Sequence, residues 1–220
     1  MRDEDFEVFI SEFGEATHRV DVPIETIQKW RDKLPDLLLT YWQEEGWCGY
    51  ANGLFWIVDP EDYEDLVDEW LENTSIEQID VFHVVGRTAF GDLHVCGERT
   101  GVNMTISCPI NAIFALAKDL KPKSKEDQDW SVRSFVGLSA SECDLEDESG
   151  VPLFERAVAK LGPLEPDEIY GFEPAIVLGG KMQLENLVKI NLDVHLTILR
   201  QLATPTVPFS NVDIEKLLKP

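Results

Sequence analysis

The sequence predicts an α+β fold in which antiparallel sheets are flanked by helices and two domains associate. Helical and strand patterns occur in blocks along the chain, without the strand–helix–strand alternation of a parallel sheet. Between residues 79 and 107, short apolar runs are separated by turn residues, which is typical of an antiparallel meander. An Asn-Gly pair at 52–53 between two further apolar runs indicates a β-hairpin.

The first 120 residues are expected to form one domain. Apolar side chains spaced three and four residues apart predict helices over 6–13, 23–34, 35–45, 59–72 and 109–120. Asp59 can cap the fourth of these helices and Pro60 fits its first turn. Its buried face is expected to consist of Tyr63, Leu66, Val67, Trp70 and Leu71. Strands are predicted over 47–50, 54–58, 79–85, 93–96 and 102–107.

A polar, charged segment at 121–131 is expected to link this domain to a second one at 132–220. Strands are predicted over 132–138, 175–178 and 187–190. An acidic loop at 139–150 and a helix at 153–161 lie between the first two of these strands. The final helix, 192–202, is expected to bury one apolar face formed by Leu192, His195, Leu196, Leu199 and Leu202.

The net charge of the chain limits the kinds of molecule that it is expected to bind. The sequence has 42 acidic and 19 basic residues, a formal net charge of −23. Such a chain repels nucleic acids and anionic membranes and attracts basic protein surfaces. The N-terminus does not read as a secretory signal, and no apolar run reaches the roughly 20 residues that span a bilayer. We therefore expect a cytoplasmic protein.

Metal, disulfide and catalytic motifs are lacking in the sequence. The four cysteines are widely spaced without a CxxC pair, and the four histidines form no HxxxH pattern, so we expect no metal, no cofactor and reduced thiols. An enzymatic alternative would use Asp92 and His94, which share a strand face, as an acid–base pair. No nucleophile elbow or phosphate loop accompanies them. The structural alternative expects Phe90 to pack in the core and Arg87 to pair with a buried acid.

Two groups of sequence strings are distinctive. The first half of the chain contains EEGWCGY at 44–50, GLFW at 53–56, DPEDY at 59–63 and RTAFGDL at 87–93, and it resembles the bacterial GAD-like domain. The last third contains GPL at 162–164, DEIYGF at 167–172 and LGG at 178–180, and it is similar to the C-terminal domain of type VI secretion immunity proteins.

This two-part resemblance implies an immunity protein with no catalytic residues, related to the SUKH-type α+β folds. The implied partner is a cognate nuclease effector, a DNase, bound as a 1:1 heterodimer and inhibited by occlusion of its active or DNA-binding site. Two other classes stay open. One is an acidic adaptor or chaperone that escorts a basic effector without abolishing its activity, and the other is the hydrolase based on Asp92 and His94.

The helix after Asp59 is the first candidate for contact with the toxin. Residues 59–80 include ten acidic and no basic side chains. Because like charges three and four residues apart destabilise a helix, this face is not explained by folding alone. The alternative is a solvated face that aids solubility. The candidate contact residues on this helix are Glu61, Glu64, Asp65, Asp68, Glu69 and Glu72.

Two further candidates lie in the second half of the chain. Flexible acidic segments can enter a DNA-binding groove as phosphate mimics, although most are simply solvated loops. The residues of this loop are Glu142, Asp144, Glu146, Asp147 and Glu148. Trp130 follows the charged linker and is the tryptophan expected to be exposed, which makes it an interface candidate because aromatic residues are enriched in binding hot spots.

Overall fold

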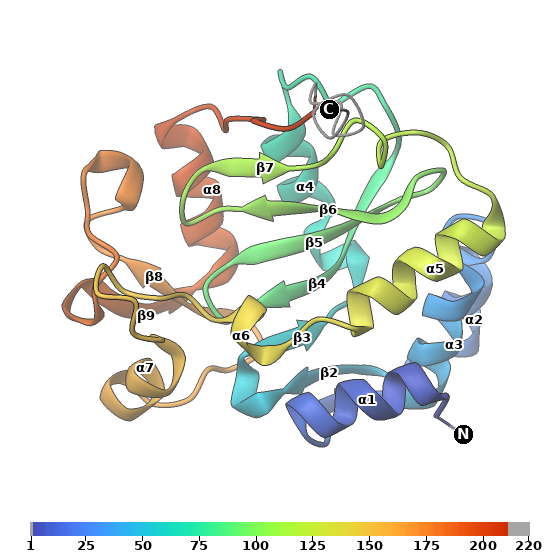
Figure 1. The fold of residues 1–220 in the computed structure, drawn as a ribbon, viewed down its shortest axis with the longest axis horizontal. Coiled ribbons are helices and arrows are strands. Elements are labelled where there is room, and N and C mark those ends of the chain that lie inside the picture. The colour runs from blue at the N-terminus through green and yellow to red at the C-terminus, as the bar shows by residue number, and fades with distance from the viewer. Residues whose placement is uncertain (1, 211–220) are drawn as a thin grey trace, which may run out of the picture.

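A seven-stranded antiparallel sheet forms the centre of the molecule (Figure 1). The structure, a computed structural model, describes residues 2–210. Each strand pairs with the next one along the chain, so the predicted meander is confirmed and includes additional strands. The strands are β1 (Thr17–Val20), β2 (Trp47–Tyr50), β3 (Phe55–Ile57), β4 (Phe82–Thr88), β5 (Asp92–Gly97), β6 (Gly101–Ser107) and β7 (Ala112–Phe114).

The predicted hairpin at Asn52-Gly53 is confirmed. In the pairing of β2 with β3, Cys48 lies opposite Ile57 and Tyr50 opposite Phe55. The connecting turn, η1 (Ala51–Gly53), has positive φ at all three residues, up to 92° at Gly53, which favours Asn and Gly. The chain reaches this hairpin through three helices, α1 (Glu4–Phe13), α2 (Ile24–Trp30) and α3 (Asp36–Glu45).

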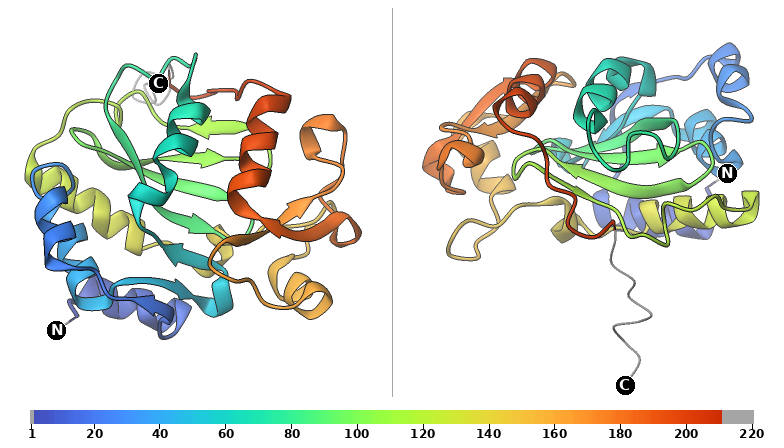
Figure 2. Two further views of the ribbon diagram at one scale, coloured as in Figure 1. Left: turned by 180° about the vertical axis from the view of Figure 1, so that it is seen from behind. Right: turned by 90° about the horizontal axis from the view of Figure 1, so that it is seen from above.

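Helices cover both faces of the large sheet (Figure 2). One face carries α1 and α5 (Lys125–Val136), and the other carries α4 (Glu64–Leu71) and α8 (Leu192–Leu202). Successive strand residues point to opposite faces. Accordingly, Phe55 joins the core under α1 and α5, whereas its neighbour Trp56 joins the core under α4 and α8.

The C-terminal part adds a second, two-stranded sheet of β8 (Glu168–Phe172) and β9 (Leu187–Asn191). The amide of Tyr170 in β8 donates a 2.9 Å hydrogen bond to the carbonyl of Ala89, next to β4. Both hydrophobic cores contain residues from both halves of the chain. The remaining short elements are η2 (Pro60–Tyr63), α6 (Ala140–Cys143), α7 (Phe154–Leu161), η3 (Ile176–Leu178) and η4 (Leu184–Asn186).

The strand expected over 132–138 was wrong, because α5 occupies most of this segment and also most of the expected linker at 121–131. Ser124 caps the helix by accepting a 3.1 Å hydrogen bond from the amide of Asp127. The buried residues Val132, Phe135 and Val136 follow the three- and four-residue spacing of a helix. A capped start and this spacing outweigh the polar composition of the first turn.

Three other expectations need correction. The helix over 109–120 is replaced by turns and β7, because Ile113 is buried and pairs with Ile106 of β6. The strand over 175–178 is instead the 3₁₀ turn η3, which leads into Gly179 with its positive φ of 88°. The final helix agrees with its expected bounds, but Leu202 is exposed, because it lies four residues from the exposed Ile198 and away from the buried side of α8.

Candidate functional site

The acidic helix begins where the sequence indicates. The Asp59 carboxylate accepts a 3.0 Å hydrogen bond from the amide of Glu61 and caps the 3₁₀ turn η2 (Pro60–Tyr63), which continues into α4. Burial raises the pKa of Asp59 to about 6, and the nearby Asp62 and Glu61 carboxylates add to this rise. The predicted inward face is confirmed, since its members are all buried: Tyr63, Leu66, Val67, Trp70 and Leu71.

The opposite side of η2 and α4 carries the candidate carboxylates. We define the acidic face as Glu61, Glu64, Asp65, Asp68, Glu69 and Glu72. All of these residues are exposed except Glu69, which is half-buried. Lys29 of α2 lies 2.9 Å from Glu61, and within residues 2–210 this is the only ion pair of the face. The face therefore presents mainly uncompensated negative charge.

A hollow of about 530 Å³ opens at the C-terminal end of α4. The buried side chains Leu71 and Phe82 line it together with carboxylates, including Asp68, Glu72 and Glu77. Glu77 was not singled out from the sequence. Its carboxylate also accepts a 2.9 Å hydrogen bond from the amide of Asn73, which folds the chain back after α4. An arginine or lysine side chain could lay its apolar stem on this floor and its charge among the carboxylates.

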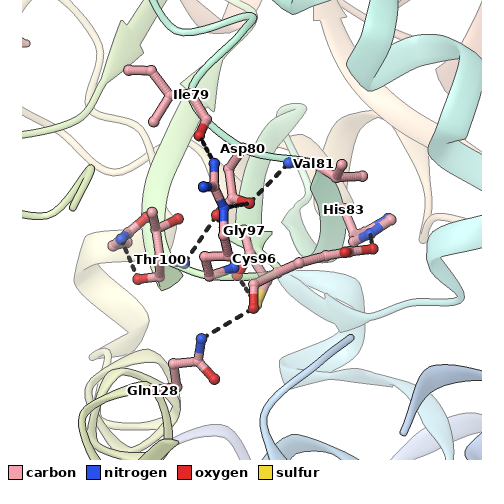
Figure 3. A network of polar contacts seen from close by, with 11 residues as sticks. Ile79, Asp80, Val81, His83, Cys96, Gly97, Thr100 and Gln128 are labelled. Carbon is pink, nitrogen blue, oxygen red and sulfur yellow. Dashed lines mark hydrogen bonds and ion pairs between the residues drawn. The ribbon is translucent and has the colours of Figure 1, made fainter. Parts of the chain in front are cut away.

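Asp80, at the end of the same acidic stretch, has a structural role (Figure 3). Its carboxylate accepts hydrogen bonds from the amides of Val81 at 3.0 Å and of Arg99 and Thr100 at 2.9 Å each. The Arg99 guanidinium lies 3.2 Å away. Asp80 thus fastens this segment to the turn between β5 and β6, and its charge is already compensated.

The acidic loop is more ordered than expected of a flexible phosphate mimic. Glu142 accepts hydrogen bonds from the amide and the hydroxyl of Ser139 at 2.8 and 2.9 Å, which cap α6 and lower the pKa of Glu142. Asp144 accepts hydrogen bonds from the amides of Leu153 and Phe154, at 3.3 and 2.9 Å. These two carboxylates hold the backbone of their own loop.

The other loop residues follow the same pattern with one exception. Asp147 lies 2.6 Å from Arg156 of α7, and this ion pair lowers the pKa of Asp147. Glu148 accepts a 2.7 Å hydrogen bond from the amide group of Gln183. Glu146 is exposed and lines a groove of about 670 Å³ between η1 and α7. Most of the negative charge in this loop is therefore engaged in local structure.

The candidate residues do not converge on one surface. Trp130 is 61% exposed, as expected, but it lies on α5, and the Arg133 guanidinium is 5.7 Å from its ring centroid. The acidic face lies across the large sheet from α5 (Figure 2). The acidic loop follows α6, on the same side of the sheet as α5 (Figure 1). One partner surface cannot contact all three groups without wrapping around the sheet.

Asp92 and His94 make no hydrogen bond or ion pair with each other in the described structure. Asp92 instead accepts a 2.6 Å hydrogen bond from the hydroxyl of Ser107, and burial raises its pKa to about 6. The His94 ring centroid lies 5.5 Å from those of Phe55 and Phe135, and burial lowers the pKa of His94 to about 4. Each of the two side chains thus interacts with other neighbours, whereas the enzymatic alternative expects them to act as a pair.

The prediction that Arg87 pairs with a buried acid was wrong. The side chain is fully buried, but its guanidinium stacks on Trp56 at 4.7 Å and donates a 2.7 Å hydrogen bond to the carbonyl of Pro166. No carboxylate among residues 2–210 forms an ion pair with it. A delocalised guanidinium tolerates this aromatic and carbonyl environment better than an ammonium group would. Arg87 thus joins β4 to the segment that leads into β8.

Neither a metal-binding cluster nor a membrane-spanning helix is present among the described residues. No cluster of three or more His, Cys, Asp or Glu within 2–210 is arranged to hold a metal ion. All four cysteines are free and buried. Among the helices of the described segment, none has the length and apolarity needed to cross a membrane.

Two family models match this chain. The model of the GAD-like domain matches residues 4–110. The model of the T6SS immunity protein Tdi1, C-terminal, matches residues 129–203. The chain combines a GAD-like domain with a Tdi1-type C-terminal immunity domain. The two resemblances seen in the sequence are confirmed, and the C-terminal family implies an immunity protein of the type VI secretion system that binds a cognate effector.

A solved structure has the same fold. The crystal structure of Atu4351 from Agrobacterium tumefaciens is similar to this immunity protein with a TM-score of 0.81, at 23% sequence identity. The similarity covers 92% of this chain and 91% of that one, so the whole arrangement of both sheets and their helices is shared. No curated protein matches the chain.

Proposed function

We propose that this immunity protein neutralises a type VI nuclease effector, a DNase, by binding it directly as a 1:1 complex. The acidic face of α4 carries the proposal. A nuclease that binds DNA must present basic residues to the phosphate backbone. A surface of largely uncompensated carboxylates is complementary to such a region and accelerates association with it.

The acidic face is held in place before any partner arrives. Trp70, on the inner side of α4, donates a 3.2 Å hydrogen bond from its indole to the carbonyl of Leu196 in α8. Arg200 of α8 donates to the carbonyls of Glu69 and Glu72, at 2.9 and 2.8 Å. A prearranged surface loses little conformational freedom on binding, which favours high affinity.

The carboxylate spacing supports a role beyond folding. Glu64 and Asp68, Asp65 and Glu69, and Asp68 and Glu72 are each four residues apart on one helix. Each like-charge pair destabilises a helix by about 0.2–0.5 kcal/mol. In this proposal the protein retains that penalty because the charges attract a basic effector. Inhibition consists of occluding the active or DNA-binding site in the cytoplasm, without a catalytic step, metal or cofactor.

Growth protection tests the proposal. The nuclease encoded beside this chain is produced in a bacterial cytoplasm with the wild-type protein, without it, or with a variant. We expect wild-type protein to restore growth and to copurify with the nuclease. Copurification without protection would instead support the adaptor or chaperone alternative. Failure both to protect and to bind would refute the immunity function for that nuclease.

A further inference from the structure

Three of the five exposed residues of α8 are apolar, and the other two are Asp193 and Gln201. Val194, Ile198 and Leu202 are 54%, 46% and 40% exposed. Their four-residue spacing places them on one side of the helix, and they form what we name the apolar stripe. The neighbouring turn η3, which contacts α8, carries a further exposed apolar residue, Leu178.

This exposure is not a consequence of poor packing within the helix. The opposite side of α8 is fully used, since Leu192, Leu196 and Leu199 are buried in the core beneath α4 and α8. The stripe is therefore a second apolar face on the same helix. Single exposed apolar residues are ordinary on protein surfaces, but contiguous ones mark interaction sites.

The stripe and the acidic face lie on the same side of the large sheet, on two neighbouring helices. Helices α4 and α8 contact each other and cover the same side of the large sheet (Figure 2). The Arg200 hydrogen bonds to the carbonyls of Glu69 and Glu72 fix the two helices relative to one another. An apolar patch next to charged residues has the usual composition of a protein interface, with a desolvated centre and a polar rim.

We propose that the apolar stripe is the anchor for the same basic effector that the acidic face attracts, an inference that rests on the proposed function. The effector approaches under the attraction of the α4 carboxylates. Apolar side chains at the edge of its basic surface then cover Val194, Ile198 and Leu202. Because α4 belongs to the GAD-like part and α8 to the Tdi1-type part, the effector contacts both parts of the chain.

The experiment compares dissociation rates for a catalytically inactive form of the nuclease encoded beside this chain. Val194→Ser combined with Ile198→Ser removes most of the stripe at exposed positions. Val8→Ser combined with Val20→Ser, on α1 and β1, is the control at two other valines, which are somewhat more exposed than Val194 and Ile198. We expect the stripe variant to dissociate at least about tenfold faster, with little change in association rate. The control should behave like the wild type.

A photo-crosslinking residue supplies a readout that does not depend on destabilising the complex. Placed at Ile198 it should crosslink to the nuclease, and placed at Val8 it should not. The stripe variant could dissociate at the wild-type rate and show no crosslink at Ile198 while the wild type still binds the nuclease. That result would overturn the proposed role of the stripe and leave the proposed function intact. If the stripe instead mediates self-association, the wild type will sediment as a dimer and the stripe variant as a monomer with unchanged nuclease binding, which also overturns it. Absence of wild-type binding would refute the proposed function and this inference together.

Discussion

The acidic face of α4 and the acidic loop at 142–148 have similar compositions, yet their carboxylates do different things. On α4, the helix satisfies its own backbone amides, so the side chains extend into solvent. In the loop, the amide of Phe154 has no such partner, and the Asp144 carboxylate accepts its hydrogen bond. The comparison shows that acidic residues are available to a partner where regular backbone structure does not need them.

The largest expected effect is on association with the nuclease. Glu64→Lys, Asp65→Lys and Asp68→Lys together should slow association by about tenfold or more at low salt, because electrostatic steering is reversed. The difference should shrink as salt screens the charges. Stopped-flow mixing with inactive nuclease measures the rate. The control is Glu4→Lys, Glu7→Lys and Glu126→Lys, an equal charge change on α1 and α5, and equal slowing by both variants would show that only net charge matters.

Substitutions in the acidic loop should instead change the free energy of unfolding. Asp144→Ala leaves the amide of Phe154 without its acceptor, whereas the amide of Leu153 still donates to the carbonyl of Leu145 at 2.8 Å, and we expect a loss of about 1.5 kcal/mol in the free energy of unfolding. Urea denaturation measures it. Asp144→Asn keeps an acceptor oxygen and should lie within about 0.5 kcal/mol of the wild type. An unchanged free energy of unfolding in Asp144→Ala would contradict the structural role of the loop carboxylates.

A substitution at Asp59 can distinguish the capping role of this side chain from the effect of its charge on stability. Its folded-state pKa of about 6 lies above the ordinary value, so the folded protein binds this proton more tightly than the unfolded chain does. The stability contributed by this group therefore falls as pH rises from about 4 to about 6. Asp59→Asn keeps the cap and removes the titration.

We expect the Asp59→Asn variant to be more stable than the wild type by about 1 kcal/mol at pH 7.5, after allowing for solvent screening. The advantage should diminish as the pH is lowered toward about 5. Thermal unfolding at a series of pH values measures it. A constant difference across that series would contradict the assigned protonation.

The smallest expected effect concerns repulsion along α4. Asp68→Asn removes like-charge pairs with Glu64 and Glu72 and should stabilise the fold by about 0.5 kcal/mol. The same change should weaken attraction to the nuclease slightly. Urea denaturation and binding kinetics on one protein sample measure both quantities. Loss of stability in this variant would mean that the Asp68 carboxylate has a structural role.

Regular periodicity allowed much of the fold to be predicted. The inward face of α4 and the hairpin at Asn52 follow directly from residue spacing and turn chemistry. The strand β7 could not be predicted in this way. Its residues suit a helix locally, and pairing with β6 decides the outcome through a partner outside the local sequence.

The candidate site was predictable to a similar extent. Helical spacing alone places Glu64 and Asp68 on the outer side of α4. The fates of Asp80 and Asp144 depend on backbone amides that lie up to 20 residues away, which composition does not reveal. The apolar stripe carries a local signal, since Val194 and Ile198 fall opposite Leu192 and Leu196 on the helix, but only the structure shows that nothing in the described chain covers it.

A DNA-cleavage titration tests the central claim most directly. Purified nuclease is mixed with increasing amounts of the wild-type protein, and the cleavage of plasmid DNA is followed. The account predicts that cleavage falls linearly and stops at one molar equivalent, because each protein molecule occludes one nuclease. Full cleavage at a large molar excess of the protein would contradict it.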